Sequence, residues 1–234
     1  LEGGTYTVTV TDAGGCSADF NITILEPTEI LSEVEPNSFW GEDSLGIPYH
    51  IRCNGGTDGS IIASNSGGTA PISYLWNTIP PQTTSTATGL AAGTYTLYVE
   101  DENGCEEETD VTLNEPDLII PNIDTSHYST SLSGITHEIS CYGLYDGWSI
   151  SNPTGGYPGS QGYSFIWINN NNQIMELVDS AVDLSALYSY TVTVTDMNGC
   201  SQSATTSMFD QPDPFDADVT TTNYAGATHA PFTV

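Results

Sequence analysis

The sequence predicts an all-β chain built from tandem β-sandwich domains in a head-to-tail array. Three observations lead to this prediction: a long internal repeat, segments in which apolar and polar residues alternate, and tight turns between those segments. Alternation with period two is typical of a strand with one buried face, and several short strands joined by turns favour a sandwich. A repeat of about 90 residues can enclose its own core, so each repeat is expected to be a domain.

The repeat is defined by motifs that return in the same order along the chain. The segment 1–8 (LEGGTYTV) recurs at 90–97 and, less faithfully, at 187–192. An acidic residue, a turn, a cysteine and then an X-Pro pair follow each copy. We therefore expect the C-terminal part of a preceding repeat, two complete repeats and the N-terminal part of a following repeat. Their predicted bounds are 1–26, 27–116, 117–212 and 213–234.

The last two strands of each repeat have the clearest pattern. Residues 5–11 (TYTVTVT) alternate and are rich in β-branched side chains, and residues 107–113 alternate again and are expected to pair back in their own repeat. Asn-Gly at 103–104 and at 198–199 is a signal for a type I′ hairpin turn, in which both central residues have positive φ. With the other short strands, about seven per repeat, this predicts immunoglobulin-like (PKD-like) sandwiches.

Five aromatic residues recur at equivalent places in the repeats. Trp76 and Trp167 lie on the presumed third strand and are expected in the core. Tyr6, Tyr95 and Tyr190 open the penultimate strand, which suits a tyrosine corner with a buried ring and a hydroxyl bonded to nearby backbone. Core packing is the simpler interpretation of these rings, and a platform for stacking sugars is the alternative.

The charge is extreme and excludes several kinds of partner. Lysine and arginine total 1, which is Arg52, against 30 acidic residues, for a net charge of −29. Binding to nucleic acid or to an anionic membrane surface needs cations, so neither is expected. No apolar run is long enough for membrane insertion. Because hydrophobic residues reach 38% and aromatic residues 10%, the chain can still bury a core.

No pattern of catalytic residues is present. The four histidines have no zinc-ligand spacing, and neither a nucleophile elbow nor a phosphate-binding loop occurs. We expect no enzyme activity and no catalytic residue.

Five cysteines occupy repeat-locked positions, which argues for a structural role in an exported chain. The candidates for disulfides are Cys16, Cys53, Cys105, Cys141 and Cys200. Pairing within a repeat would join turns at opposite ends of an immunoglobulin-like sandwich, farther apart than the roughly 7 Å that a disulfide spans. A head-to-tail array favours Cys53–Cys200 instead. Pairing of sequence neighbours, Cys16–Cys53 with Cys105–Cys141, and buried free thiols both stay open.

The excess of acidic groups suggests calcium as a cofactor. Hard oxygen ligands suit Ca²⁺, and divalent cations would offset the repulsion between carboxylates. The candidate ligands are turn residues, namely Asp58, Asp101, Asp146 and Asp196. The alternative is a solvated acidic surface that keeps an exported protein soluble.

Several motifs in order resemble one known family. They are CNGGTDGS at 53–60, GGTAPISYLW at 67–76, GLAAGTYT at 89–96 and DENGC at 101–105. Together they resemble the SprB-type repeat of gliding-motility adhesins, very large cell-surface proteins exported by the type IX secretion system. Residues 53–116 match the motif closely. Residues 141–212 match with departures, such as Trp148 in place of a small residue.

The resemblance implies a repeat segment of a filamentous cell-surface adhesin, extracellular, acting as a stalk and surface-contact element. Neighbouring repeats would be its partners, together with surface polysaccharide or other cell-surface proteins. Ser44 and Ser180 stand in Asp-Ser-apolar tripeptides that resemble O-glycosylation sites of the same bacterial group, and both are predicted in loops. The alternative function is a carbohydrate-binding or accessory β-sandwich module of a secreted enzyme.

Overall fold

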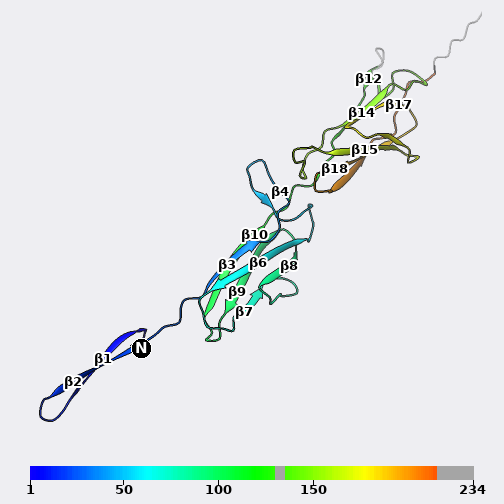
Figure 1. Cartoon of the computed structure of the whole chain (residues 1–234). Coiled ribbons are helices and arrows are strands. Elements are labelled where there is room, and N and C mark those ends of the chain that lie inside the picture. Colours follow the sequence, from blue (N-terminus) through cyan, green and yellow to red (C-terminus); the bar gives the residue numbers. More distant parts are fainter. Residues whose placement is uncertain (130–134, 215–234) are drawn as a thin grey trace, which may run out of the picture. The chain divides into compact units, whose positions relative to one another are not determined.

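A computed structural model describes residues 1–129 and 135–214, and every regular element in it is a β-strand. The predicted all-β class is therefore confirmed, with antiparallel sheets that form β-sandwiches (Figure 1). The part of the chain that is described contains no helix with the length and apolarity of a membrane span. Most of the expected N-terminal part of a following repeat, 213–234, lies outside the described residues.

The chain divides into two compact units that do not follow the repeat boundaries. The first unit comprises Leu1–Ile120, Pro153–Tyr163 and Val194–Gln202. The second comprises Pro121–Asn152, Ser164–Thr193 and the chain from Ser203 onward. The last hairpin of the second complete repeat is thus shared, and its tip belongs to the first unit.

The first complete repeat forms a sandwich of two three-stranded sheets with one common core. One sheet has the order β3-β6-β8 and the other β10-β9-β7 (Figure 1). The strands are β3 (Leu31–Pro36), β6 (Gly59–Ser66), β7 (Ser73–Trp76), β8 (Thr86–Leu90), β9 (Gly93–Glu100) and β10 (Glu106–Leu113). Residues between β3 and β6 form the separate small hairpin β4 (Gly41–Glu42) and β5 (Pro48–Tyr49). The seven-strand prediction is therefore wrong for this repeat, whose two sheets hold six strands.

The second complete repeat has a sheet of three strands, β11-β14-β17, and a sheet of four, β16-β15-β18-β19. The three-stranded sheet contains β11 (Ile123–Thr125), β14 (Gly147–Ser151) and β17 (Ser180–Leu184). The four-stranded sheet contains β15 (Ser164–Asn169), β16 (Ile174–Glu176), β18 (Tyr190–Thr195) and β19 (Ser201–Thr205). A short hairpin pairs β12 (Tyr128–Ser129) with β13 (Thr136–His137).

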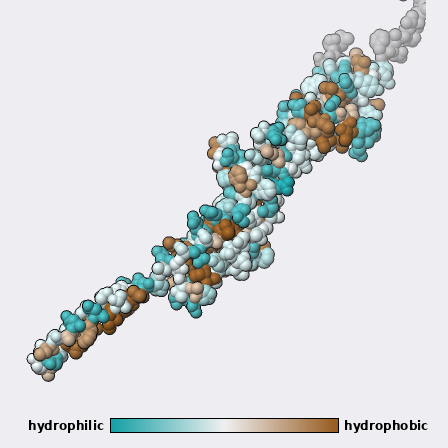
Figure 2. Space-filling model, viewed as in Figure 1, coloured by the Kyte–Doolittle hydropathy of each residue, from teal (hydrophilic) through white to brown (hydrophobic). Residues whose placement is uncertain are grey.

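The N-terminal hairpin of β1 (Gly4–Thr11) and β2 (Ser17–Ile24) leaves an apolar face in solvent. Val8 and Val10 are about half exposed, as are Phe20 and Ile22 on the partner strand, and Figure 2 shows this brown surface along the hairpin. The equivalent side chains of β9 and β18 are buried in their sandwiches. The hairpin therefore has the pattern of the last strand pair of the two sandwiches, with its apolar face exposed in this structure.

The core tryptophans lie where the repeat predicted. Trp76 in β7 and Trp167 in β15 are completely buried. Each indole N–H donates to a backbone carbonyl, Trp76 to Thr84 at 2.9 Å and Trp167 to Val178 at 3.2 Å. A buried indole needs such a partner, because an unpaired N–H in the core costs about 1–3 kcal/mol. The two sandwiches thus solve the same packing problem in the same way.

The hydroxyl bonds of the predicted tyrosine corners are present, but only the Tyr190 ring is buried, whereas Tyr6 and Tyr95 are partly buried. The hydroxyl of Tyr6 donates to the carbonyl of Glu2 at 2.8 Å, and that of Tyr95 to Ala91 at 3.0 Å. The hydroxyl of Tyr190 donates to Ser185 O at 3.1 Å, and its ring is buried against Phe209. Each corner fixes the entry into the last strand pair of its repeat.

The type I′ prediction for the Asn-Gly turns is wrong. In the first complete repeat Gly104 has φ of +79°, but Asn103 is not among the residues with positive φ. The amide of Gly104 donates to Asp101 O, and the Asp101 carboxylate accepts from the amides of Asn103 and Cys105. The aspartate side chain therefore organises the turn around itself, as Asx turns do, and only the glycine takes the left-handed conformation.

Gly67 is expected to tolerate no side chain. A Cβ there would lie 1.9 Å from the carbonyl oxygen of Glu29, and its φ is +73°. Gly89 has nearly the same φ, +71°, but open space around the Cβ position. We expect Gly67→Ala to lower the free energy of unfolding by several kcal/mol and Gly89→Ala by about 1–2 kcal/mol, the cost of the left-handed conformation alone. Urea denaturation of both variants measures the difference, and equal losses would contradict it.

His50 is expected to make the first sandwich sensitive to mild acid. It is buried, its Nδ1 accepts from the amide of Asn114 at 3.0 Å, and burial lowers its pKa. Because the unfolded chain then takes up the proton first, stability is complete above the ordinary pKa of about 6.5 and is lost as pH falls through the lower folded value. The urea midpoint should fall between pH 7.5 and pH 5.5. His50→Gln should flatten this slope, whereas the exposed control His127→Gln should keep it.

Candidate functional site

The hairpin between β18 and β19 presents Cys200 from a turn closed by Asp196. The amide of Asp196 donates to the carbonyl of Cys200 at 2.9 Å, and the amide of Gly199 donates to Asp196 O at 3.1 Å. The Asp196 carboxylate accepts from the amides of Cys200 at 2.9 Å and Tyr157 at 2.8 Å. These bonds hold the cysteine in one backbone conformation at the tip of the hairpin.

Cys53 precedes β6 in a turn that is fixed from both sides. Ile51 is completely buried, and its amide donates to Asn114 O at 3.1 Å. The amide of Gly56 donates to Cys53 O at 2.8 Å, and the amide of Gly55 donates to the Glu115 carboxylate at 2.7 Å. The two residues that follow β10, Asn114 and Glu115, therefore fasten this turn to the sandwich of the first repeat.

A disulfide joins Cys53 to Cys200, with a Cα–Cα distance of 5.6 Å and a sequence separation of 147. This distance is ordinary for a disulfide. Of the pairings that the sequence left open, the structure contains Cys53–Cys200, which joins the two complete repeats. The remaining cysteines, Cys16, Cys105 and Cys141, are free and exposed.

Polar contacts surround the disulfide within the first unit. The only cation of the chain, Arg52, donates from Nε to the carbonyl of Asn198 at 2.7 Å and lies 5.4 Å from the ring centroid of Trp40. The side-chain Nδ2 of Asn198 donates to Trp40 O at 2.8 Å. A guanidinium over an indole face adds roughly 0.5–1 kcal/mol at an exposed site. No local pattern predicts the contacts of Asn198 with Arg52 and Trp40, because they join residues 146 and 158 positions apart.

Asp101 holds Cys105 as Asp196 holds Cys200, and it also affects its thiol. The negative charge of Asp101, with some burial, raises the pKa of the Cys105 thiol. The pKa of Asp101 itself is lowered by the hydrogen bonds it accepts from Cys105 and Thr69. Since the thiolate is the reactive form, Cys105 is expected to react slowly at neutral pH.

The four candidate calcium ligands lie in separate turns and accept hydrogen bonds there. Asp58 accepts from the amide of Arg52 at 3.1 Å, and Asp146 accepts from the amide of Ser140 at 3.1 Å and from its hydroxyl. The Ser140 hydroxyl lowers the pKa of Asp146. The carboxylates of Asp101 and Asp196 accept hydrogen bonds from backbone amides of their own turns, as described above. Within the described ranges no three His, Cys, Asp or Glu residues gather as a metal site.

Calcium binding stays a prediction, and it has a direct test. A specific site stabilises the folded state in a way that screening cannot reproduce. We expect a higher melting temperature in millimolar CaCl₂ than in NaCl of equal ionic strength, reversal by EDTA, and a smaller gain for Asp58→Asn and Asp101→Asn. Equal melting temperatures in the two salts would reduce the acidity to a means of staying soluble.

The two glycosylation candidates differ in their surroundings. Ser44 is exposed in the loop between β4 and β5, beside the exposed Leu45. Ser180 was predicted in a loop, but it is the first residue of β17, where it is partly buried and pairs with Ile150 of β14. The loop prediction for Ser180 is wrong because β17 begins at the serine itself. Modification of either residue stays a prediction.

The first unit also contains an open cleft of about 780 Å³. Tyrosines and acidic side chains line it, among them Glu42, Asp43, Tyr49, Asp117, Tyr157 and Tyr163. The rings of Tyr49 and Tyr157 meet edge to face with centroids 6.4 Å apart. Burial, with Asp43 and Asp117 nearby, raises the pKa of Tyr49, so its hydroxyl stays a hydrogen-bond donor at neutral pH. Such a surface can stack and hydrogen-bond a polar ligand.

These features define a class of all-β protein, in which β-sandwiches follow one another along the chain and a disulfide joins Cys53 to Cys200. The family model described as SprB repeat matches residues 51–80, which contain Cys53, β6 and β7. The match supports the resemblance seen in the motifs and indicates a repeat of an adhesin-like protein that is surface-exposed or secreted. Comparison with curated proteins gave no match.

Proposed function

We propose that this chain is a repeat segment of a large filamentous cell-surface adhesin, a stalk that also contacts surfaces. In this proposal the parent protein is exported by the type IX secretion system and serves gliding motility, as the family resemblance implies. The observation that carries the proposal is the Cys53–Cys200 disulfide, which links two consecutive repeats covalently.

The disulfide supports a mechanical role because it changes the path of tension. A pull along the chain enters the first complete repeat and would pass from Cys53 directly to Cys200, which bypasses most of both sandwiches. The bypassed strands then carry none of the tension and need not unfold. A covalent shortcut of this kind is useful in a surface fibre and has no evident use in an accessory domain of an enzyme.

Surface exposure and adhesion can be tested on intact cells of the source organism. Antibodies raised against the folded chain should label the outside of unpermeabilised cells, and brief treatment with proteinase K should remove the label. Their Fab fragments should lower the attachment of cells to glass, while Fab fragments from pre-immune serum should not. Labelling only after permeabilisation would contradict the proposal.

The tyrosine-lined cleft favours carbohydrate binding as a second candidate function. Aromatic rings with neighbouring carboxylates suit neutral sugars, which present both apolar faces and hydroxyl groups. In native gels that contain laminarin or xyloglucan, a binding chain would be retarded relative to gels without polysaccharide. Tyr157→Ala should remove the retardation, and Tyr145→Ala, exposed outside the cleft, serves as the control. Equal mobility in all gels would rule out these polysaccharides.

A further inference from the structure

The five cysteines fall into two kinds by their place in the repeat. Three follow the turn of the last hairpin and are called hairpin cysteines here: Cys16, Cys105 and Cys200. Two lie six residues before a strand of the three-stranded sheet, β6 or β14, and are called strand-entry cysteines: Cys53 and Cys141. The disulfide in the structure joins the strand-entry cysteine of one repeat to the hairpin cysteine of the next repeat. The pairing therefore has a direction along the chain.

The hairpin cysteines share one backbone frame whether or not they are bonded. In all three turns, the carboxylate of an aspartate four residues earlier accepts a hydrogen bond from the cysteine amide at 2.9 Å. The amide of that aspartate donates to the cysteine carbonyl at 2.9, 3.0 and 2.9 Å. The glycine before the cysteine has φ of +86°, +79° and +81°. Cys105 and Cys16 are thus presented in the same way as the bonded Cys200.

The strand-entry cysteines also share one frame. The amide before Cys53 donates to Asp58, and the amide before Cys141 donates to Asp146, both at 3.1 Å. Two residues after each cysteine, a glycine amide donates to a side chain at the end of the same repeat: Gly55 to Glu115 at 2.7 Å and Gly143 to Gln211 at 2.9 Å.

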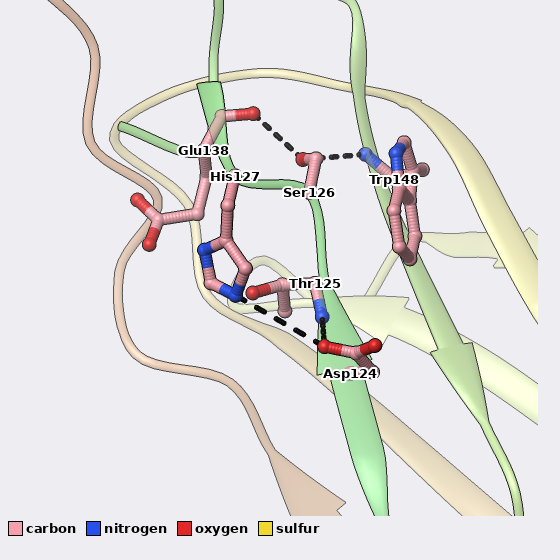
Figure 3. Close-up of polar contacts among 6 residues, drawn as sticks. All are labelled: Asp124, Thr125, Ser126, His127, Glu138 and Trp148. Atoms are coloured by element: carbon pink, nitrogen blue, oxygen red, sulfur yellow. Dashed lines mark hydrogen bonds and ion pairs between the residues drawn. The ribbon is translucent and has the colours of Figure 1, made fainter. Parts of the chain in front are cut away.

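The segment ahead of each strand-entry cysteine is held by an equivalent serine. The hydroxyl of Ser126 donates to the carbonyl of Glu138 at 2.7 Å and accepts from the amide of Trp148 at 3.1 Å (Figure 3). The hydroxyl of Ser38 donates to His50 O at 2.6 Å in the first complete repeat. The exposed thiol of Cys141 therefore occupies the same position in its repeat as Cys53 does in the first complete repeat.

We infer that Cys105 and Cys141 each form a disulfide equivalent to Cys53–Cys200, with a cysteine of a further copy of the repeat. Cys141 bonds the hairpin cysteine of the repeat that follows, and Cys105 bonds the strand-entry cysteine of the repeat that precedes. The partner is a complementary cysteine of a repeat of this kind. Cys16 follows the same rule. Every inner repeat of such an array then takes part in two disulfides, one with each neighbouring repeat.

The chemistry of the step is thiol–disulfide exchange. Two thiols lose two protons and two electrons to form one S–S bond, and the electrons reduce an external disulfide such as oxidised glutathione to two thiols. A bond between Cys105 and Cys141 does not fit the rule, because it would join a hairpin cysteine to the strand-entry cysteine of the following repeat. The structure leaves both of these thiols free while Cys53–Cys200 is formed.

An internal duplication of the full chain tests the inference. In this variant, residues 1–212 are followed directly by residues 28–234, so the two complete repeats occur twice in tandem. After refolding with oxidised and reduced glutathione at pH 8.5, free thiols are alkylated and the disulfides are mapped by mass spectrometry. We expect three disulfides: Cys53–Cys200 in each copy, and Cys141 of the first copy with Cys105 of the second. Cys16, Cys105 of the first copy and Cys141 of the second should be alkylated.

Matched serine variants give the controls. Cys105→Ser in the second copy should remove only the middle disulfide, whereas Cys105→Ser in the first copy should leave all three. The inference is overturned if Cys141 of the first copy is alkylated, bonds to Cys105 of its own copy, or gives covalent dimers on a non-reducing gel. The inference rests on the repeat array of the proposed function, yet the two fail separately. If Cys141 of the first copy fails in one of these ways while both Cys53–Cys200 bonds form, only the inference is overturned and the proposed function is unaffected. If the Cys53–Cys200 bonds themselves do not form, the proposed function loses its main support.

Discussion

Cys200→Ser is expected to cause the largest loss of stability of any single substitution in the chain. The Cys53–Cys200 bond closes a loop with a sequence separation of 147. By the loop-entropy estimate, removal of such a crosslink lowers the free energy of unfolding by about 5 kcal/mol, because the unfolded chain regains the freedom that the bond denied it. Urea unfolding without reductant measures this loss.

The exposed free thiol of Cys105 provides the control for this substitution. Cys105→Ser changes the same atoms in an equivalent turn but breaks no disulfide, so its unfolding curve should match that of the unmodified chain. Dithiothreitol should lower the stability of the unmodified chain to that of Cys200→Ser and leave that variant unchanged. Equal stability of Cys200→Ser and the unmodified chain would show that the bond contributes nothing.

Trp76→Ala is expected to cost about 3–5 kcal/mol of unfolding free energy. The indole is completely buried in the core of the first sandwich, and its truncation leaves a cavity and an unpaired carbonyl at Thr84. Trp167→Ala should cost a similar amount in the second sandwich, where the indole is equally buried. Trp148→Ala, with a side chain 39% exposed, should cost much less. Thermal unfolding followed by circular dichroism compares the three, and a loss for Trp148→Ala as large as that for Trp76→Ala would contradict the core assignment.

The strands and the core could be predicted because their signals are local and repeat. Alternation in residues 5–11 and in 107–113 marks strands that exist, and Trp76 and Trp167 are buried because the same motif places them on equivalent strands. The tyrosine corners followed from the same logic, since a tyrosine after a Leu/Gly turn has a backbone carbonyl four or five residues back within reach.

Other features could not be predicted, because they depend on contacts that no local pattern records. The Asn-Gly pair at 103–104 gave the wrong turn type because the carboxylate of Asp101 competes for the amides of the turn. The contact of Arg52 with Asn198 depends on two segments about 150 residues apart. The disulfide lay between these cases: the repeat reduced the possible pairings to a few, and only the structure distinguished among them.

Single-molecule force spectroscopy on the full chain, pulled from its two ends, tests the central claim most directly. The claim is that tension passes through the Cys53–Cys200 bond and bypasses the chain between these residues. A separation of 147 residues corresponds to about 500 Å of extended chain, at roughly 3.3–3.6 Å per residue. The account predicts that complete unfolding releases about 500 Å less contour length without reductant than with dithiothreitol, and that Cys200→Ser releases the full length in both conditions. The same released length with and without reductant would contradict it.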